Sequence, residues 1–230
     1  MKVVVLTGAG ISAESGVPTF RDADGLWEGH RVEDVATPEG FEADPDVVHQ
    51  FYDARRRALS AVEPNAAHRA LAKLERHLGE DLLVVTQNVD DLHERAGSTR
   101  VLHMHGELRA ARCTSCGVRH RWDEALVHRP PCPRCGTPTL RPDVVWFGEL
   151  PYGMDEIESA LSEADHFVSI GTSGEVYPAA GFVQIAKAFG ARTLELNLLP
   201  SSGSRWFTES RHGPAGLLVP AWVDSLIPQP

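Results

Sequence analysis

Residues 3–13 read VVVLTGAGISA, a short apolar run that leads directly into a glycine-rich turn. The run is continuously apolar, as expected of a parallel strand that is covered on both faces. Gly8, Gly10 and Ala13 match the G-x-G-x-x-G/A pattern, in which glycines let the backbone approach a pyrophosphate at the start of a helix. Because the pattern also occurs in purely structural turns, it predicts a nucleotide-binding fold only together with the rest of the chain.

The rest of the chain alternates short apolar runs with helical patterns. We predict further strands at residues 82–86, 167–171, 193–197 and 217–220. We predict helices at residues 65–78, 155–164 and 178–190. Strands that alternate with helices imply an α/β fold with a doubly wound parallel (Rossmann-like) sheet.

Two stretches interrupt this alternation. Residues 30–60 are mainly helical and rich in Asp, Glu and Arg, and residues 109–141 hold all four cysteines. We expect these two insertions to come together as one smaller domain. Residues 1–29, 61–108 and 142–230 then form the nucleotide-binding domain.

The four cysteines form two C-x-x-C pairs that are separated by fifteen residues: Cys113, Cys116, Cys132 and Cys135. This spacing matches a zinc pattern in which four thiolates complete a closed tetrahedral shell, so the metal is structural. Two disulfides or unrelated core cysteines are the alternatives. His120 and His128 lie between the pairs and could replace a cysteine ligand, although solvated loop histidines also fit. The inserted domain is thus expected to be a helical module plus a zinc module.

The chain has 230 residues and a formal net charge of −10. This charge argues against a nucleic-acid partner but is compatible with basic, lysine-containing peptides. No apolar run approaches the ~20 residues of a membrane span, so we expect no membrane association. Because Met1 and Lys2 run straight into the first strand, we expect no export signal and a cytoplasmic protein. The oligomeric state is not fixed by the sequence, and a monomer is the working expectation.

Five motifs resemble those of the sirtuin family and occur in the family's order. They are residues 8–27 (GAGISAESGVPTFRDADGLW), 86–90 (TQNVD), 103–106 (HMHG), 171–173 (GTS) and Asn197. The similarity covers essentially the whole chain and implies an NAD-dependent protein-lysine deacylase. The family pattern usually has Ile at the position of Val89, which is a volume-conserving change. The chain starts at its first strand without the extension of many relatives, and we expect this to leave catalysis untouched.

The resemblance also implies where NAD binds. A standard dinucleotide fold has an acidic residue about 20 residues after the glycines, which holds the ribose. Residues 14–22 form a polar loop here instead, so we expect NAD to be bound in a non-standard way. In sirtuins the equivalents of Asn88 and Asp90 bind the nicotinamide end, and that of Asn197 meets the adenosine ribose. The residues expected at NAD are Gly8, Ala9, Gly10, Ser12, Phe20, Arg21, Trp27, Gln87, Asn88, Asp90, Gly171, Thr172, Ser173, Asn197 and Ala215. Taken singly, each could be an ordinary strand-end turn, and Asn88 an Asx-turn.

Two histidines compete for the role of catalytic base. Strand alternation places His103 and His105 on the same side, so spacing does not choose between them. The resemblance favours His105, which precedes the glycine as the family's catalytic histidine does, and Asn88 assists. In the implied mechanism nicotinamide leaves, the acyl-lysine oxygen attacks the ribose, and His105 takes a proton from a ribose hydroxyl. The products are nicotinamide, O-acyl-ADP-ribose and free lysine.

The family's substrate peptide adds as a strand between two segments, here residues 144–149 and 174–177. Val145 and Phe147 are therefore expected at the peptide, although Trp146 and Phe147 could equally be core residues. Tyr52 and Arg55 share a helix face and match the Tyr-x-x-Arg feature of sirtuins that remove succinyl, malonyl or glutaryl groups. Ala36 resembles the small residue that opens their acyl pocket. The alternative is that residues 55–57, three arginines, form a solvated helix face.

Acetyl-lysine should remain a substrate, because its reacting carbonyl is the same. Two other functions stay open at this point. One is a mono-ADP-ribosyltransferase on the same fold, which would not require an acylated peptide. The other is a zinc-ribbon binding module on a nucleotide-binding domain, which nicotinamide release would exclude.

Overall fold

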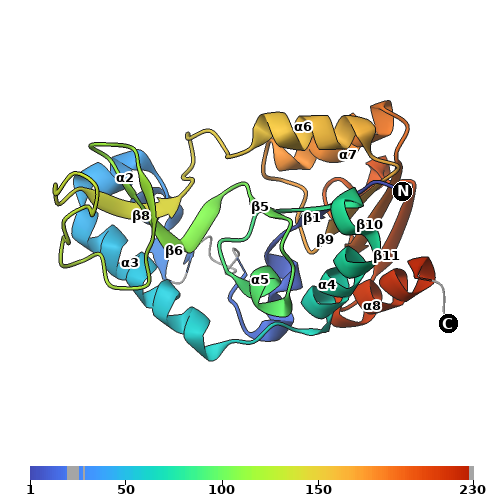
Figure 1. Ribbon diagram of the computed structural model, residues 1–230, viewed down its shortest axis with the longest axis horizontal. Helices are drawn as coiled ribbons and strands as arrows, with labels where there is room; N and C mark the ends of the chain where they lie inside the picture. Colours follow the sequence, from blue (N-terminus) through green and yellow to red (C-terminus); the bar gives the residue numbers. More distant parts are fainter. Residues whose placement is uncertain (20–25, 28, 228–230) are drawn as a thin grey trace.

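The computed structural model describes residues 1–19, 26–27 and 29–227. A larger part holds the main sheet and a smaller part holds the four cysteines, and the two lie at opposite ends of the long axis (Figure 1). No helix within the described residues is long and apolar enough to cross a bilayer.

The main sheet has six strands in the order β11-β10-β9-β1-β4-β5, and all its pairs are parallel. The strands are β1 (Val3–Thr7), β4 (Leu82–Thr86), β5 (Val101–His103), β9 (His166–Ile170), β10 (Arg192–Asn197) and β11 (Glu209–His212). Every residue of β1 and β4 is buried, which confirms the interpretation of continuous apolar runs as strands covered on both faces. Thr7 lies opposite both Thr86 and Ile170, so the carboxyl ends of the three central strands are level.

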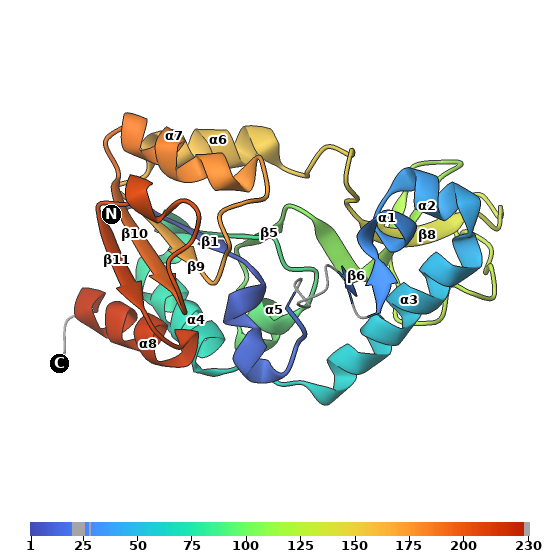
Figure 2. The same ribbon diagram turned by 180° about the vertical axis from the view of Figure 1, so that it is seen from behind.

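Helices cover both faces of this sheet (Figure 2). On one face Leu71 of α4 (Ala66–Leu78) and Trp222 of α8 (Ala215–Leu226) pack with Val5. On the other face Leu161 of α6 (Met154–Glu163) and Phe182 of α7 (Phe182–Ala188) pack with neighbours that include Leu6. The doubly wound fold is therefore confirmed. Short elements lie between the longer ones: α5 (Leu92–Ala96), η1 (Ala9–Ile11), η2 (Ala13–Ser15), η3 (Leu59–Ala61), η4 (Gly79–Asp81), η5 (Ala179–Gly181) and η6 (Ser204–Trp206).

The predicted strand at residues 217–220 is wrong, because this segment is part of α8 with Pro220 inside the helix. Short apolar runs do not distinguish a buried strand from a buried helix. The edge strand on the outer side of β10 is β11, whose four residues are polar and all exposed. An edge strand of this kind has no apolar pattern by which the sequence could reveal it.

The smaller part combines helices with a second sheet. Its helices are α1 (Val32–Val35), α2 (Pro38–Ala43) and α3 (Pro45–Ala58), and a short hairpin joins β2 (Leu26–Trp27) to β3 (His30–Arg31). The second sheet is antiparallel, in the order β7-β6-β8, from β6 (Gly106–Cys113), β7 (Arg119–Arg121) and β8 (Leu140–Val144). This sheet begins before residue 109 and ends after residue 141, and the domain boundaries stay a prediction.

A buried ion pair within α3 bonds the helical module to the zinc module. Arg56 donates to Asp53 over 2.6 Å, and both side chains are 2 % exposed. Asp53 also accepts hydrogen bonds from the backbone N–H groups of Leu126 and Val127, and Arg56 donates to the carbonyl oxygen of Leu108. Because each charge has several partners, the pair fixes α3 against the zinc module.

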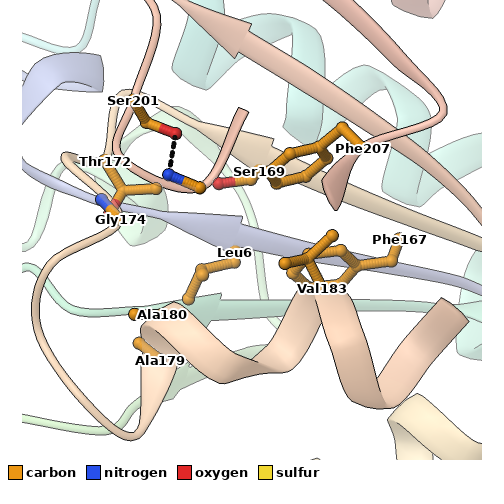
Figure 3. A pocket seen from close by; sticks show the side chains of 11 residues that line it. Leu6, Phe167, Ser169, Thr172, Gly174, Ala179, Ala180, Val183, Ser201 and Phe207 are labelled. Carbon is orange, nitrogen blue, oxygen red and sulfur yellow. Dashed lines mark hydrogen bonds between the residues drawn. The ribbon is translucent and has the colours of Figure 1, made fainter. Parts of the chain in front are cut away.

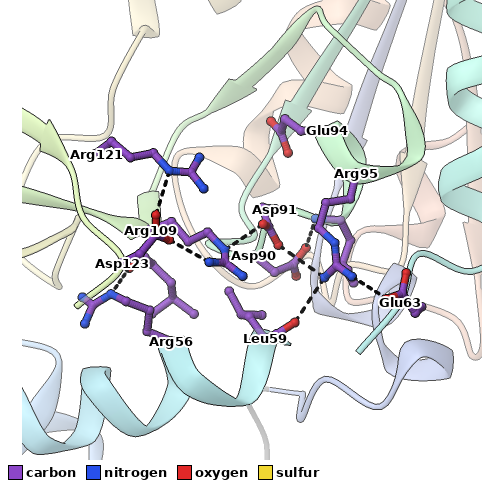
Figure 4. Close-up of polar contacts among 12 residues, drawn as sticks. Arg56, Leu59, Glu63, Asp90, Asp91, Glu94, Arg95, Arg109, Arg121 and Asp123 are labelled. Carbon is purple, nitrogen blue, oxygen red and sulfur yellow. Dashed lines mark hydrogen bonds and ion pairs between the residues drawn. The ribbon is translucent and has the colours of Figure 1, made fainter. Parts of the chain in front are cut away.

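Ion pairs also join the smaller part to the larger one (Figure 4). Asp91, which precedes α5, lies 2.8 Å from Arg109 of β6 and 3.8 Å from Arg95. Arg109 continues to Asp123 over 2.7 Å, and Arg95 to Glu63 over 2.8 Å. These ion pairs start from Asp91, the neighbour of Asp90 in the sequence, where the smaller and larger parts meet.

Candidate active site

A cleft of about 1420 Å³ opens at the carboxyl ends of the central strands. The chain passes from β1 to β4 on one side and later returns to β9 on the other, so the sheet order reverses at β1. Ligands of open α/β sheets bind at this kind of switch point. The cleft exceeds the usual range of about 300–1,000 Å³ for a single small-molecule site, so it has room for two ligands.

Most of the predicted site residues line this one cleft. They are Gly8, Ala9, Gly10, Trp27, Ala36, Tyr52, Arg55, Gln87, Asn88, Asp90, His105, Val145, Phe147, Gly171, Thr172, Ser173 and Asn197. Ser12 does not line the cleft but is hydrogen-bonded to Asn88, which does. Ala215, the first residue of α8, packs against the hydrophobic core. Phe20 and Arg21 lie outside the described residues.

The glycine-rich turn packs tightly against the turn that follows β9. A Cβ atom on Gly8 or Gly10 would come within 2.8 or 2.7 Å of the carbonyl oxygen of Gly171. The N–H groups of Gly8 and Gly10 donate to the carbonyl oxygens of Ile170 and Gly171, over 3.0 and 2.8 Å. Both glycines also line the cleft, and their role at a pyrophosphate stays a prediction. Their small size lets two neighbouring turns of the cleft floor approach each other.

A buried hydrogen-bond network orients Asn88. Its Nδ2 donates to Ser12 Oγ over 3.1 Å, and Ser12 donates to Asp90 Oδ2 over 3.0 Å. His68 Nδ1 accepts from the N–H of Asn65, so Nε2 carries the proton and faces Ser12 Oγ at 3.4 Å. This bond orients the amide and leaves Oδ1, together with the second hydrogen of Nδ2, for other partners.

The charges of this network follow from its burial. Burial lowers the pKa of His68 to about 4, so its ring is neutral at pH 7. Burial raises the pKa of Asp90, against the hydrogen bonds from the Leu92 N–H and the Ser12 hydroxyl. Further buried hydrogen bonds support this network from behind. His93 is hydrogen-bonded to the Thr7 hydroxyl, which donates to the Thr86 hydroxyl, and Thr86 accepts from the backbone N–H of Asn88. His68, His93 and Thr7 were not predicted as site residues, because hydroxyls and rings inside helices and strands carry no motif. Thr86 was predicted only as the first residue of the TQNVD motif.

The two candidate histidines have different surroundings. His105 lines the cleft, and its Nδ1 lies 3.2 Å from the carbonyl oxygen of Gln87, which only accepts. The proton is therefore on Nδ1, and Nε2 has a free lone pair. Burial lowers the pKa of His105, which keeps the ring neutral. His103 instead lies 2.8 Å from Glu94; burial lowers its pKa, but Glu94 outweighs this effect and the pKa is raised.

The far end of the cleft holds Tyr52, Arg55 and Ala36. The Arg55 guanidinium lies over the Trp27 ring, 4.2 Å from its centroid. The three consecutive arginines separate: Arg55 lines the cleft, Arg56 is buried, and Arg57 is exposed. The alternative of one solvated helix face is therefore wrong for Arg55 and Arg56.

The segment after β8 borders the same end. The N–H of Val145 donates to the His105 carbonyl oxygen, and the N–H of Phe147 donates to the Ala36 carbonyl oxygen. Trp146 is 2 % exposed and Phe147 is 47 % exposed, so the core interpretation holds for Trp146 and fails for Phe147.

The opposite end of the cleft is built around Asn197 and Thr172. Asn197 Nδ2 donates to the Thr172 carbonyl oxygen over 2.8 Å, and Gln87 Nε2 donates to the Thr172 hydroxyl over 3.1 Å. The adjoining loop is tied by Ser201, which accepts a hydrogen bond from the Gly203 N–H (Figure 3). The Ser201 hydroxyl also donates to buried Glu195. The cavity drawn there measures about 10 Å³, which holds nothing larger than a water molecule.

The four cysteine Sγ atoms lie within 4.8 Å of one another, and the four thiols are free of disulfides. The Cys113–Cys135 and Cys116–Cys132 pairs are 3.6 and 3.8 Å apart, close to the roughly 3.8 Å between ligands of a tetrahedral Zn–S site. The thiols therefore fit a structural zinc ion. His120 Nε2 lies 3.4 Å from Cys132 Sγ, whereas His128 is exposed.

Comparison with known proteins agrees with this fold. Residues 8–178 match the Sir2 family. The NAD-dependent protein deacylase of Escherichia coli K12 is 60 % identical over 229 residues, which cover 98 % of this chain and 82 % of that protein. A solved Sir2 homolog–NAD complex is 43 % identical with a TM-score of 0.89, covering 98 % of this chain and 89 % of that one. A structure of Sir2 bound to an acetylated peptide is 28 % identical with a TM-score of 0.82, covering 97 % and 92 %. The chain belongs to the Sir2 family.

Proposed function

We propose that this chain is an NAD-dependent protein-lysine deacylase that removes succinyl, malonyl and acetyl groups. One observation carries the proposal: a single cleft joins the predicted cofactor residues around Asn88 and Asn197 to an end that is lined by Tyr52 and Arg55. The similar proteins are named as an NAD-dependent deacylase, an NAD complex and a complex with an acetylated peptide. The substrate is an acylated lysine side chain of a protein or peptide.

His105 acts as the general base. Its Nε2 has the free lone pair, and the lowered pKa keeps it unprotonated near neutral pH. NAD, when bound, supplies the ribose that releases nicotinamide and receives the acyl group as O-acyl-ADP-ribose. His105 takes the proton from a ribose hydroxyl, and Asn88 presents its Oδ1 to the nicotinamide end because Ser12 fixes its amide. Asp90 accepts from Ser12 and completes this support.

Tyr52 and Arg55 would bind the free carboxylate of an acidic acyl group. A guanidinium and a phenol offer charge-assisted and neutral donors from one helix. Ala36 leaves room beside them, since its side chain is small and it lines the same end of the cleft. A charge-assisted bond contributes about 1.5–3 kcal/mol, which corresponds to roughly ten- to a hundredfold discrimination.

The zinc ion would hold the shape of the small module and take no part in the reaction. The cytoplasmic location, the monomeric state and the domain boundaries at residues 29, 60, 108 and 141 are retained as predictions. Thiols that are grouped for a metal fit a reducing compartment.

The test is a comparison of kcat/KM for one peptide that carries acetyl-lysine or succinyl-lysine, with and without NAD. We expect cleavage of both only with NAD, and a clear preference for succinyl-lysine. Preference for acetyl-lysine would remove the acidic-acyl assignment and leave the deacylase. ADP-ribose transfer to an unacylated protein, without cleavage of either peptide, would favour the mono-ADP-ribosyltransferase.

A further inference from the structure

Trp146 makes a direct hydrogen bond to the proposed acyl-binding tyrosine. Its indole Nε1 donates to the Tyr52 hydroxyl oxygen over 3.0 Å. The two side chains come from different modules, ninety-four positions apart in the sequence, and are 2 % and 0 % exposed. Water therefore does not compete for this bond.

The bond determines how the Tyr52 hydroxyl can act. A phenol has one hydrogen to donate and lone pairs to accept, and an indole N–H can only donate. Trp146 therefore occupies a lone pair and leaves the Tyr52 hydrogen for another acceptor. Among the described residues this is the one hydrogen bond of the Tyr52 hydroxyl. Burial raises the pKa of Tyr52, so the hydrogen is retained at physiological pH.

The indole is itself held in place on several sides. The Arg141 guanidinium lies 3.3 Å from the centroid of the Trp146 ring. Arg141 donates to both carboxylate oxygens of Glu149, over 2.8 and 2.9 Å. Glu149 in turn accepts from the Trp146 backbone N–H over 2.9 Å. This closed set of contacts fixes where Nε1 points.

We propose that Trp146 is a specificity-determining positioning residue that turns the Tyr52 hydroxyl into an obligate donor toward the carboxylate of an acidic acyl group. The inference rests on the proposed function, because it assumes that Tyr52 and Arg55 bind that carboxylate. Trp146 does not touch the reacting atoms. It acts through Tyr52, and its influence should vanish when the hydroxyl is absent.

The experiment is a double-mutant cycle with Trp146→Phe, Tyr52→Phe and the double variant. For each, kcat/KM is measured with NAD on the same peptide carrying succinyl-lysine or acetyl-lysine. We expect Trp146→Phe to lower the succinyl value roughly tenfold while the acetyl value changes less than about twofold. In the Tyr52→Phe background the same substitution should change neither value. Trp122→Phe, which removes an indole N–H in the zinc module, is the matched control and should keep the wild-type ratio.

The outcomes separate this inference from the proposed function. If wild type prefers succinyl-lysine and Trp146→Phe keeps that preference, the inference is overturned and the proposed function stands. Equal losses on both acyl groups, or an undiminished effect in the Tyr52→Phe background, mean that Trp146 only supports folding, and this also overturns the inference. If wild type cleaves acetyl-lysine without any succinyl preference, the acidic-acyl assignment and the inference fail together while the deacylase remains.

Discussion

His105 Nδ1 lies 3.2 Å from the backbone carbonyl oxygen of Gln87. Since the carbonyl can only accept, the bond fixes the tautomer of His105 and leaves Nε2 as the basic nitrogen. Gln87 directly follows β4, and β5 leads to His105 with Met104 between them. The ends of two neighbouring strands, β4 and β5, thus hold the proposed base His105 and its hydrogen-bond partner in place.

Replacement of this base should abolish most of the activity. We expect His105→Ala to lower kcat/KM by about 10²–10⁴-fold on succinyl-lysine and acetyl-lysine alike, because general base catalysis serves both. The measurement is steady-state kinetics on both peptides, with NAD binding and thermal unfolding as controls for intact structure. A loss confined to one acyl group would contradict the role of His105.

The pH profile of kcat/KM should have its acidic limb below pH 6.5. Burial lowers the pKa of His105 from its usual value of 6.5, so the free base persists to a lower pH. Activity should fall only as the pH drops through this lowered pKa, where Nε2 becomes protonated. An acidic limb centred above pH 7 would argue against His105 as the titrating base.

Substitutions on α3 should separate acyl preference from catalysis. We expect Arg55→Met to reduce kcat/KM for succinyl-lysine roughly ten- to a hundredfold and to leave acetyl-lysine nearly unchanged. Arg57→Met is the matched control, since Arg57 is exposed two residues further along the same helix. The assignment fails if both variants behave alike.

Removal of one thiol should cost stability rather than chemistry. Cys132→Ala is expected to lose bound zinc and to unfold the small module, because a closed four-thiolate site stabilises the module on binding. Zinc per chain and thermal unfolding are the measurements. His128→Ala is the control and should keep one zinc per chain. Loss of the metal in this variant or in His120→Ala would identify that histidine as a zinc ligand.

The buried histidine behind the cleft should make stability pH-dependent. The folded-state pKa of His68 is lowered to about 4 from 6.5, so the unfolded chain binds an extra proton between these values. Stability should therefore fall as the pH drops below 6.5, by about 2 kcal/mol at pH 5 from this group. Denaturant unfolding at pH 7 and pH 5 measures the effect. The difference in unfolding free energy between the two pH values should shrink in His68→Gln. It should persist in the control His77→Gln, which changes an exposed histidine on the same helix.

The sequence predicted the parts of the fold that depend on local patterns. The apolar strands β1, β4, β9 and β10, the helix α4 and the spacing of the cysteines all carry signals within a few residues. The edge strand β11 carries none, because an exposed polar strand is defined only by its neighbour. The apolar run at residues 217–220 was assigned to the wrong element for the same reason: tertiary packing decides whether it is a strand or a helix.

The site shows the same limit. Motif residues could be named in advance, and seventeen of them line one cleft. The partners that orient them could not, because the contacts of Ser12 with Asn88, of His93 with Thr7 and of Trp146 with Tyr52 span seventy-six, eighty-six and ninety-four positions. Long-range hydrogen bonds of this kind leave no periodic trace in a sequence.

The separation of the three arginines on α3 has a consequence for how this enzyme could diversify. Arg56 ties the helix to the zinc module through Asp53, while Arg55 on the next position faces the cleft. On this helix Arg56 therefore makes the structural contacts, while the adjacent Arg55 is placed to contact a ligand in the cleft. On the proposed function, a substitution at Arg55 would change which acyl group is accepted without disturbing the contacts that hold α3 on the zinc module.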